Sequence, residues 1–200
     1  MSHNISVAIL AGGKSERFGR DKTLTMLNNK PLIKYVVDAF SEVDDIVIIA
    51  KNIKKYNILN TTKVVDKYES QCPLVGIITA LEYTVNDLVY IVSADMPFVN
   101  MEIFKILNRY LEKDVDILLP KINGKIYTLA GIYRKRAKKV LEENFKSGKN
   151  KILDAFGNLK VNTLDERYFR DVDPQFISFL NINKKEDFIH AEKLVKKVFL

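Results

Sequence analysis

Short apolar runs alternate with segments of helical periodicity along the first half of the chain. The runs at 7–10, 46–50 and 88–93 are typical of buried β-strands, bounded by polar or glycine residues. Between them, 31–40 begins with a proline and continues with one apolar stripe at helical spacing, and 73–83 predicts a second helix. This alternation predicts an α/β fold in which crossover helices connect the strands of a sheet.

The second half of the chain predicts a reversal of direction in the sheet. A helix capped by Asn100 should extend to Leu111, and strands are expected at 115–119 and 126–133. Only a short turn around Asn123-Gly124 separates these two strands, so we expect them to be antiparallel.

The last helix is expected to begin near Lys184. Asn183 and Glu186 have the spacing of a capping box. In this motif the side chain of the first residue accepts a hydrogen bond from the backbone amide of the second, and the side chain of the second accepts one from the amide of the first. Asn183 therefore caps this helix, contacts a ligand, or does both.

The length and composition predict one domain. The chain has 200 residues, 47% of them hydrophobic, and shows no repeat, linker or low-complexity segment. The first ten residues lack the apolar core of a signal peptide, and no run approaches the roughly 18 apolar residues of a membrane span. We therefore expect a cytoplasmic protein that does not associate with membranes.

Cysteine and histidine are too scarce for several kinds of site. Cys72 is the single cysteine, which excludes an intrachain disulfide, and His3 and His190 are the only histidines. A histidine-ligated zinc site and a Ser-His-Asp triad are therefore not expected.

The net charge of +7 is concentrated in one segment. Residues 121–151 hold ten lysines and arginines against two glutamates, so the rest of the chain is close to neutral. Within this segment, 135–145 has apolar residues at helical spacing, which predicts an amphipathic helix with a basic outer face. That face is either simply solvated or docks an anionic cofactor or acidic partner. No nucleic-acid-binding motif accompanies it.

A glycine-rich basic segment follows the first predicted strand. It reads Ile9-Leu-Ala-Gly-Gly-Lys-Ser-Glu-Arg-Phe-Gly-Arg-Asp-Lys22. The paired glycines allow backbone amides to point at an anion, and four cations follow them: Lys14, Arg17, Arg20 and Lys22. Neither the P-loop nor the dinucleotide spacing of glycines fits. The pattern indicates a triphosphate cradle, and the alternative is a glycine turn with solvated cations.

Asp95 lies just past the predicted strand 88–93. Ligands of open α/β sheets bind at the carboxyl ends of strands, and the glycine segment occupies the equivalent end of the first strand. The two segments are therefore expected to meet.

The segment from Leu10 to Lys22, followed by Lys30-Pro-Leu-Ile33, resembles the opening of the molybdenum cofactor guanylyltransferases. Its Leu-Ala-Gly-Gly start is more similar to this molybdopterin branch than to the Leu-Ala-Ala-Gly start of the cytidylyltransferases of isoprenoid synthesis. The resemblance implies a Rossmann-like nucleotidyltransferase fold: a mostly parallel central sheet with helices on both faces and an antiparallel extension on the substrate side. It further implies that residues 1–200 form one nucleotidyltransferase domain, with a nucleotide-binding part at about 1–100 and a cofactor-substrate part at about 101–200.

Further similar segments extend over nearly the whole chain. They are Asp66 followed by Pro73-Leu-Val-Gly76, then Ser93-Ala-Asp-Met-Pro-Phe98, Leu129 to Tyr133 and Asn181-Ile-Asn183. The family usually has Pro-Leu at Thr128-Leu129 and N-x-N-T-P-x-D at 181–187, so this chain departs from the pattern on the cofactor side.

The resemblance implies transfer of GMP from GTP to the terminal phosphate of molybdenum-molybdopterin, giving molybdopterin guanine dinucleotide and pyrophosphate. The implied catalytic residues are Lys22, Arg17 and Asp95. The implied GTP contacts are Leu10, Ala11, Gly12, Lys22, Asn52, Asp66 and Asp95, with Asn181 and Asn183 on the substrate side. Such transfers need positioning and charge neutralisation more than a covalent nucleophile.

Asp95 is the expected Mg²⁺ ligand, because Mg²⁺ prefers one or two carboxylates together with substrate phosphates and water. Its alternative role is to cap backbone amides before Pro97. Without the resemblance, Asn52 is as readily explained as a turn residue as by a nucleotide contact, and Asp66 as readily as a surface acid.

Other functions remain open at this point. GTP and molybdenum-molybdopterin are the implied substrates, with molybdoenzymes or cofactor-delivery proteins as further partners and no nucleic acid. The enzyme alternative is a nucleotidyltransferase that uses CTP on molybdopterin or acts on a sugar or alcohol phosphate. The non-enzyme alternative is a nucleotide-binding adaptor with a basic partner-docking helix, and a nucleic-acid binder that uses 121–151 ranks third.

Overall fold

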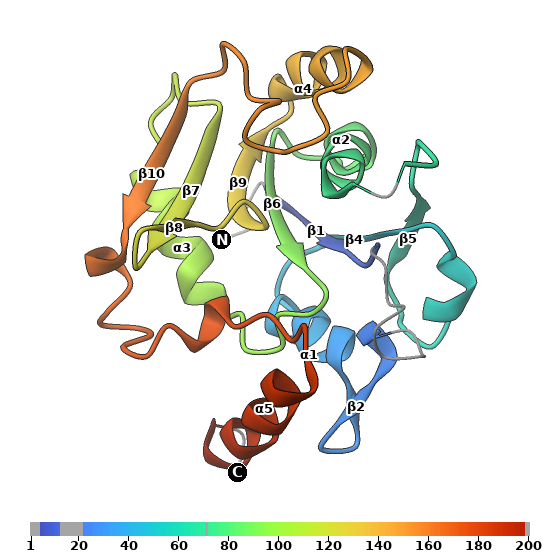
Figure 1. The fold of residues 1–200 in the computed structure, drawn as a ribbon, viewed down its shortest axis with the longest axis vertical. Coiled ribbons are helices and arrows are strands. Elements are labelled where there is room, and N and C mark those ends of the chain that lie inside the picture. Colours follow the sequence, from blue (N-terminus) through green and yellow to red (C-terminus); the bar gives the residue numbers. More distant parts are fainter. Residues whose placement is uncertain (1–4, 13–21, 71, 199–200) are drawn as a thin grey trace.

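A mixed sheet forms the centre of the protein. The computed structural model describes residues 5–12, 22–70 and 72–198 (Figure 1). The strands are ordered β10-β7-β9-β6-β1-β4-β5, and the short β8 pairs with β7. Their bounds are β1 Ile5–Leu10, β4 Asp45–Ala50, β5 Thr62–Val65, β6 Leu88–Ser93, β7 Ile117–Ile122, β8 Lys125–Ile126, β9 Ala130–Arg134 and β10 Val161–Asp165.

Most strands of this sheet run in one direction. β1 is parallel to β4 and β6, and β4 is parallel to β5. β9 is antiparallel to both of its neighbours, β6 and β7, and β10 is parallel to β7. The expected mostly parallel sheet with an antiparallel extension is confirmed. The short connection through β8 returns the chain beside β7 and so reverses β9.

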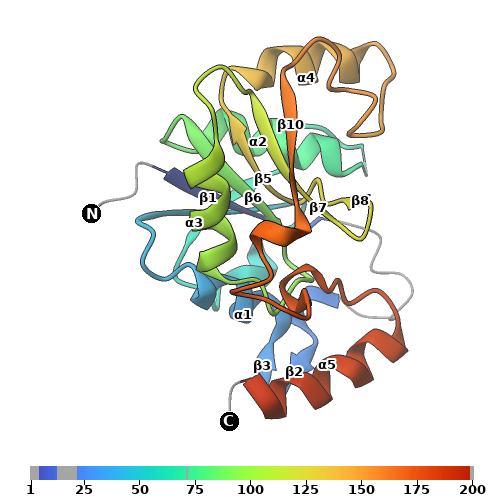
Figure 2. The same cartoon turned by 90° about the vertical axis from the view of Figure 1, so that its left-hand side faces the viewer.

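Helices cover both faces of the sheet, as predicted (Figures 1 and 2). α1 (Leu32–Ala39) and α3 (Met101–Tyr110) share one apolar cluster with the sheet. α2 (Pro73–Tyr83) and α4 (Ala137–Lys146) share the cluster on the opposite face. The crossover helices thus bury their apolar stripes on either side of the central strands, whose residues are mostly apolar.

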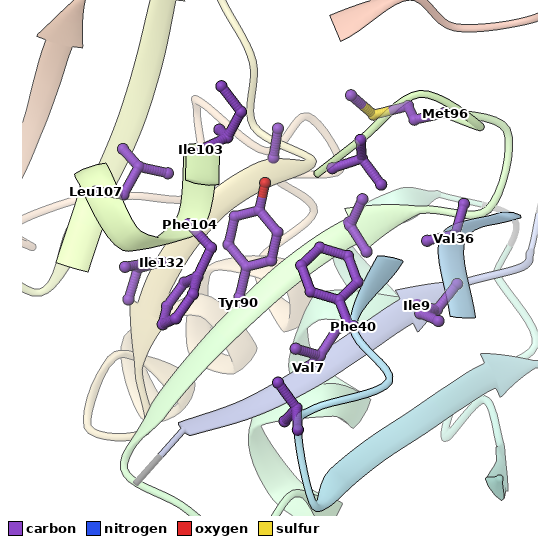
Figure 3. Close-up of a cluster of buried hydrophobic side chains, with 14 of the residues drawn as sticks. Val7, Ile9, Val36, Phe40, Tyr90, Met96, Ile103, Phe104, Leu107 and Ile132 are labelled. Atoms are coloured by element: carbon purple, nitrogen blue, oxygen red, sulfur yellow. The ribbon is translucent and has the colours of Figure 1, made fainter. Parts of the chain in front are cut away.

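Tyr90 of β6 lies in the first of these clusters (Figure 3). Its ring centroid is 5.5 Å from that of Phe40 and 5.6 Å from that of Phe104. The side chain is fully buried, and its hydroxyl oxygen has no hydrogen-bond partner in the described part of the chain.

A third, smaller cluster lies beside the sheet, at the bottom of Figure 2. The hairpin of β2 (Met26–Leu27) and β3 (Lys30–Pro31) packs there against α5 (Lys185–Val198). Short 3₁₀ helices connect the larger elements: η2 Lys22–Leu24, η3 Ile53–Tyr56, η4 Glu166–Tyr168 and η5 Ile177–Phe179.

Some predicted boundaries were wrong. Pro31 belongs to β3 and precedes α1, which begins at Leu32. The segment 126–133 is divided between β8 and β9, while β5, β10 and the β2–β3 hairpin were not predicted. The cap of α3 by Asn100 is confirmed, because its side chain accepts a hydrogen bond from the Ile103 amide.

The start of α5 also differs from the expected capping box. The Asp187 carboxylate, and not that of Glu186, accepts the backbone amides of Asn183 and Lys184, each at 2.8 Å. The side-chain oxygen of Asn183 is turned to Lys22 instead. Within the described residues, no helix has both the length and the apolar content needed to cross a bilayer.

Candidate functional site

The carboxyl ends of β1 and β6 bring the first two predicted segments together. Leu10 pairs with Ser93 in the parallel register, and the Ala94 amide donates to the Leu10 carbonyl at 3.0 Å. The backbone at 10–12 and the loop that carries Asp95 therefore lie at the same edge of the sheet, as the sequence predicted.

Lys22 joins this edge to the segment before α5. Its Nζ donates to Asp95 Oδ2 at 2.5 Å and to Asn183 Oδ1 at 3.1 Å. The Ile182 amide donates to the Asp95 carbonyl at 2.9 Å, which fixes the position of the 181–183 segment. Three segments that are distant in sequence thus converge on one ammonium group.

These residues line a hollow of about 250 Å³. Its lining is Leu10, Ala11, Gly12, Lys22, Thr23, Pro73, Ser93, Asp95, Leu129, Asn181 and Asn183. A smaller hollow shares Leu10, Gly12 and Leu129 with it and reaches Asp66. The site therefore has two adjoining compartments.

Two buried oxygens in the larger hollow remain unpaired. In the described part of the chain, neither Asp95 Oδ1 nor Asn181 Oδ1 has a hydrogen-bond partner. Oxygens of this kind are the ligands that Mg²⁺ prefers, and the ion usually completes its shell with phosphates and water. The described residues contain no cluster of three or more His, Cys, Asp or Glu side chains, so a metal here would depend on substrate oxygens. The donor set fits Mg²⁺ bound together with a nucleotide.

Asp66 lies in the smaller compartment, close to the glycine backbone. A Cβ built on Gly12 would lie 3.3 Å from Asp66 Oδ2, so the absence of a side chain allows this close approach. The Asp66 amide donates to the Ala50 carbonyl at 3.1 Å, which places it beside the end of β4. Burial raises the pKa of Asp66 above its ordinary value, while Thr79 and Lys51 act in the opposite direction.

The remaining predicted site residues divide into two groups. Arg17 lies outside the described residues, as do Lys14 and Arg20. Asn52 is described, but its side chain is exposed and lines neither compartment. The structure therefore does not bring Asn52 to the other candidates.

Several residues of the site were not predicted from the sequence. Thr23, Pro73, Ser93 and Leu129 line the hollow. Pro73, Ser93 and Leu129 belong to segments that resemble the family, and this was the available signal. Nothing in the local pattern around Thr23 distinguishes it from an ordinary turn residue.

The basic segment 121–151 forms ion pairs with acidic residues of the same protein. Lys138 Nζ lies 3.0 Å from Glu82 Oε2, and Arg134 Nη1 lies 3.1 Å from Asp87 Oδ2. Arg134 also donates to the Val115 carbonyl at 2.9 Å. Part of this charge is therefore paired within the protein, and the predicted docking role stays a prediction.

Known proteins agree with this arrangement. The model of the MobA-like NTP transferase domain matches residues 7–161. The chain is 35% identical over 193 residues to a probable molybdenum cofactor guanylyltransferase of Carboxydothermus hydrogenoformans, with 96% of each chain covered. A relative of the same name from Natranaerobius thermophilus is also 35% identical, over 98% of this chain and 99% of its own.

A solved structure extends the similarity to three dimensions. The molybdopterin-guanine dinucleotide biosynthesis protein A of Archaeoglobus fulgidus superposes with a TM-score of 0.86 at 29% identity, covering 96% of this chain and 100% of that one. From the convergence of Lys22, Asp95 and Asn183 and from these relatives, the chain belongs to the molybdenum cofactor guanylyltransferase family of nucleotidyltransferases.

Proposed function

We propose that the protein transfers GMP from GTP to the terminal phosphate of molybdenum-molybdopterin, releasing pyrophosphate and forming molybdopterin guanine dinucleotide. The observation that carries this proposal is the position of the Lys22 ammonium, held by Asp95 and Asn183 where β1 and β6 end. A cation at this edge of the sheet is suited to a triphosphate, because phosphoryl and nucleotidyl transfers proceed by positioning and charge neutralisation.

Each compartment has a distinct role in this proposal. Leu10 and Gly12 border both compartments, Ala11 borders the larger one, and the backbone of all three contacts the nucleotide. Asp66, in the smaller compartment, contacts the base or ribose, while Lys22 binds the triphosphate in the larger one. Arg17 is the proposed second cation, and Asn52 would have to move to contact the nucleotide. Asn181 and Asn183 border the side on which the acceptor phosphate enters.

Asp95 would hold Mg²⁺, and the Asn181 oxygen, which has no hydrogen-bond partner among the described residues, lines the same hollow. When bound, Mg²⁺ supplies positive charge to the phosphate oxygens on which negative charge develops. Lys22 occupies the other Asp95 oxygen and so keeps one face of this carboxylate oriented.

Calorimetric titration with GTP, CTP and ATP, each with and without Mg²⁺, tests nucleotide choice first. We expect Mg²⁺-dependent preference for GTP. Preference for CTP would favour cytidylyl transfer, and no nucleotide binding would contradict the proposal.

Pyrophosphate release in the presence of GTP and molybdenum-molybdopterin then tests the reaction. Binding of GTP without release would favour a nucleotide-binding adaptor. Release with a sugar or alcohol phosphate in place of the pterin would favour the other enzyme alternative. The cytoplasmic location and delivery to molybdoenzymes remain predictions that neither assay addresses.

A further inference from the structure

We propose that Tyr56 is a positioning residue that sets the place of Lys22 relative to the nucleotide-contacting backbone at Ala11. This inference rests on the proposed guanylyl transfer. It adds a residue outside the hollow to the machinery of the site.

The Tyr56 hydroxyl joins two parts of the site that are distant in sequence. Tyr56 ends η3, and its side chain is 1% exposed. The hydroxyl lies 2.9 Å from Thr23 Oγ1 and donates to the Ala11 carbonyl at 3.3 Å. Because its proton points to Ala11, the oxygen accepts the bond from Thr23.

Thr23 transmits this contact directly to Lys22. The two residues are consecutive in η2, and the Thr25 amide donates to the Lys22 carbonyl at 3.1 Å, which closes the turn. Thr23 is 7% exposed, so its hydroxyl is bound within the protein. The backbone of Lys22 is therefore fixed through Tyr56, while its ammonium is fixed by Asp95 and Asn183.

Ala11 provides the fixed reference for this arrangement. Its amide donates to the Ile49 carbonyl at 2.8 Å, which ties it to the end of β4. One hydroxyl thus bridges the backbone at Ala11 and the turn that carries the cation, and it contributes to the spacing between them. Misplacement of a charged group by about 1 Å can reduce a rate about a hundredfold, so this spacing bears on the rate of transfer.

The effect of removing the hydroxyl should fall on turnover. Tyr56→Phe keeps the buried ring but removes its hydroxyl contacts with Thr23 and Ala11, and we expect kcat to fall about tenfold, within the range that one preorganised electrostatic contact contributes. The KM for GTP should change less than about threefold, because the remaining backbone contacts are retained. If the role of Tyr56 were purely structural, the substitution would lower the melting temperature without lowering kcat more than it changes the KM for GTP.

Tyr35→Phe is the matched control. Tyr35 is also a buried tyrosine, and its hydroxyl donates to the Leu27 carbonyl at 2.8 Å, away from the hollow. We expect it to lower the melting temperature as much as Tyr56→Phe does and to leave kcat within about twofold of the unsubstituted protein.

Two further comparisons test whether the effect passes through Lys22. In a Lys22→Ala background, Tyr56→Phe should change the residual kcat by less than about twofold, because the positioned group is gone. Thr23→Val should reproduce the loss, and Thr23→Ser, which retains a hydroxyl, should recover most of it. The threonine pair serves the same purpose if Tyr56→Phe does not fold.

The outcomes separate this inference from the proposed function. Absence of pyrophosphate release by the unsubstituted protein would contradict guanylyl transfer itself. With that activity present, normal kcat in both Tyr56→Phe and Thr23→Val would overturn the positioning role. An equal loss with and without Lys22 would overturn it as well.

Discussion

The Lys22 side chain is the residue on which the chemistry of the site most depends. It is 18% exposed and contacts Asp95 and Asn183 instead of an apolar core. We expect Lys22→Ala to lower kcat for pyrophosphate release at least about tenfold, because charge stabilisation is lost while packing is retained. Lys34→Ala is the control, since Lys34 pairs with Asp38 on the surface of α1. Turnover near normal in Lys22→Ala would contradict the assignment.

Asp95 gives a second prediction, with a readout that does not require activity. Asp95→Asn removes the carboxylate charge but keeps a similar shape, so the fold should persist. We expect Mn²⁺ binding in the presence of GTP, followed by electron paramagnetic resonance, to weaken at least about tenfold, together with loss of turnover. Unchanged Mn²⁺ binding and a normal rate would place the metal elsewhere.

Substitution of two buried tyrosines by phenylalanine should have opposite effects on stability. Within the described part of the chain, the Tyr90 hydroxyl has no hydrogen-bond partner, whereas the Tyr133 hydroxyl donates to the Thr128 carbonyl at 2.7 Å. Loss of an unsatisfied buried group stabilises, and loss of a satisfied one destabilises. Tyr90→Phe should therefore raise the free energy of unfolding by about 1 kcal/mol, and Tyr133→Phe should lower it by a similar amount. Urea unfolding measures both, and a destabilised Tyr90→Phe would indicate a water partner for its hydroxyl.

At the scale of elements, an acidic and basic cluster joins α2 to α4. Lys67 Nζ lies 2.7 Å from Glu82 Oε2 of α2 and 3.1 Å from Glu142 Oε1 of α4. The Tyr68 hydroxyl also donates to Glu142. This bond and the lysines around it lower the pKa of Glu142 from 4.5 to about 2, against the opposing effect of burial.

Glu142 therefore predicts a pH-dependent contribution to stability. A carboxylate whose pKa is lower in the folded state stabilises the protein fully above its unfolded pKa, and the stabilisation is lost as the pH falls towards the folded pKa. Glu142→Gln should lower the free energy of unfolding by about 1 kcal/mol at pH 7. The difference should shrink between pH 4.5 and about 2. Glu143→Gln, on the exposed side of the same helix, is the control. A difference in the free energy of unfolding that does not depend on pH would contradict this account.

The success of prediction from sequence varied with the burial of each element. β6 and α2 were predicted to the residue, because continuous apolar runs ended at clear polar or proline boundaries. β5 and β10 were missed because they are short and largely polar or partly exposed, with Leu164 the only buried residue of β10. The β2–β3 hairpin did carry a signal: Asn28 and Asn29 have φ of 47° and 62°, a conformation that asparagine favours in tight turns.

At the scale of the whole molecule, the sequence predicted several residues that come together at the site, but not the contacts that hold them in place. The strand ends at Leu10 and Ser93 followed from the alternation of elements, and Lys22, Asp95 and Asn183 followed from the family resemblance. The link from Tyr56 to Thr23 joins residues 33 positions apart, and no local pattern encodes such a contact. At the start of α5, the Asn183 side chain contacts Lys22 while Asp187 accepts the Asn183 amide, and the distant contact with Lys22 is likewise not encoded locally.

The contact between Lys22 and Asn183 has a consequence for protein synthesis. These residues are 161 positions apart, so the ribosome makes Lys22 long before its partner. At about 5–20 residues per second, synthesis of Asn183 follows that of Lys22 after an interval on the order of ten seconds. Once residue 95 has been added, the strands that order Leu10 and Asp95 have been made, whereas Asn183, whose side chain contacts the lysine, has not. The nascent chain therefore acquires the elements of a nucleotide cradle before it acquires a complete catalytic centre.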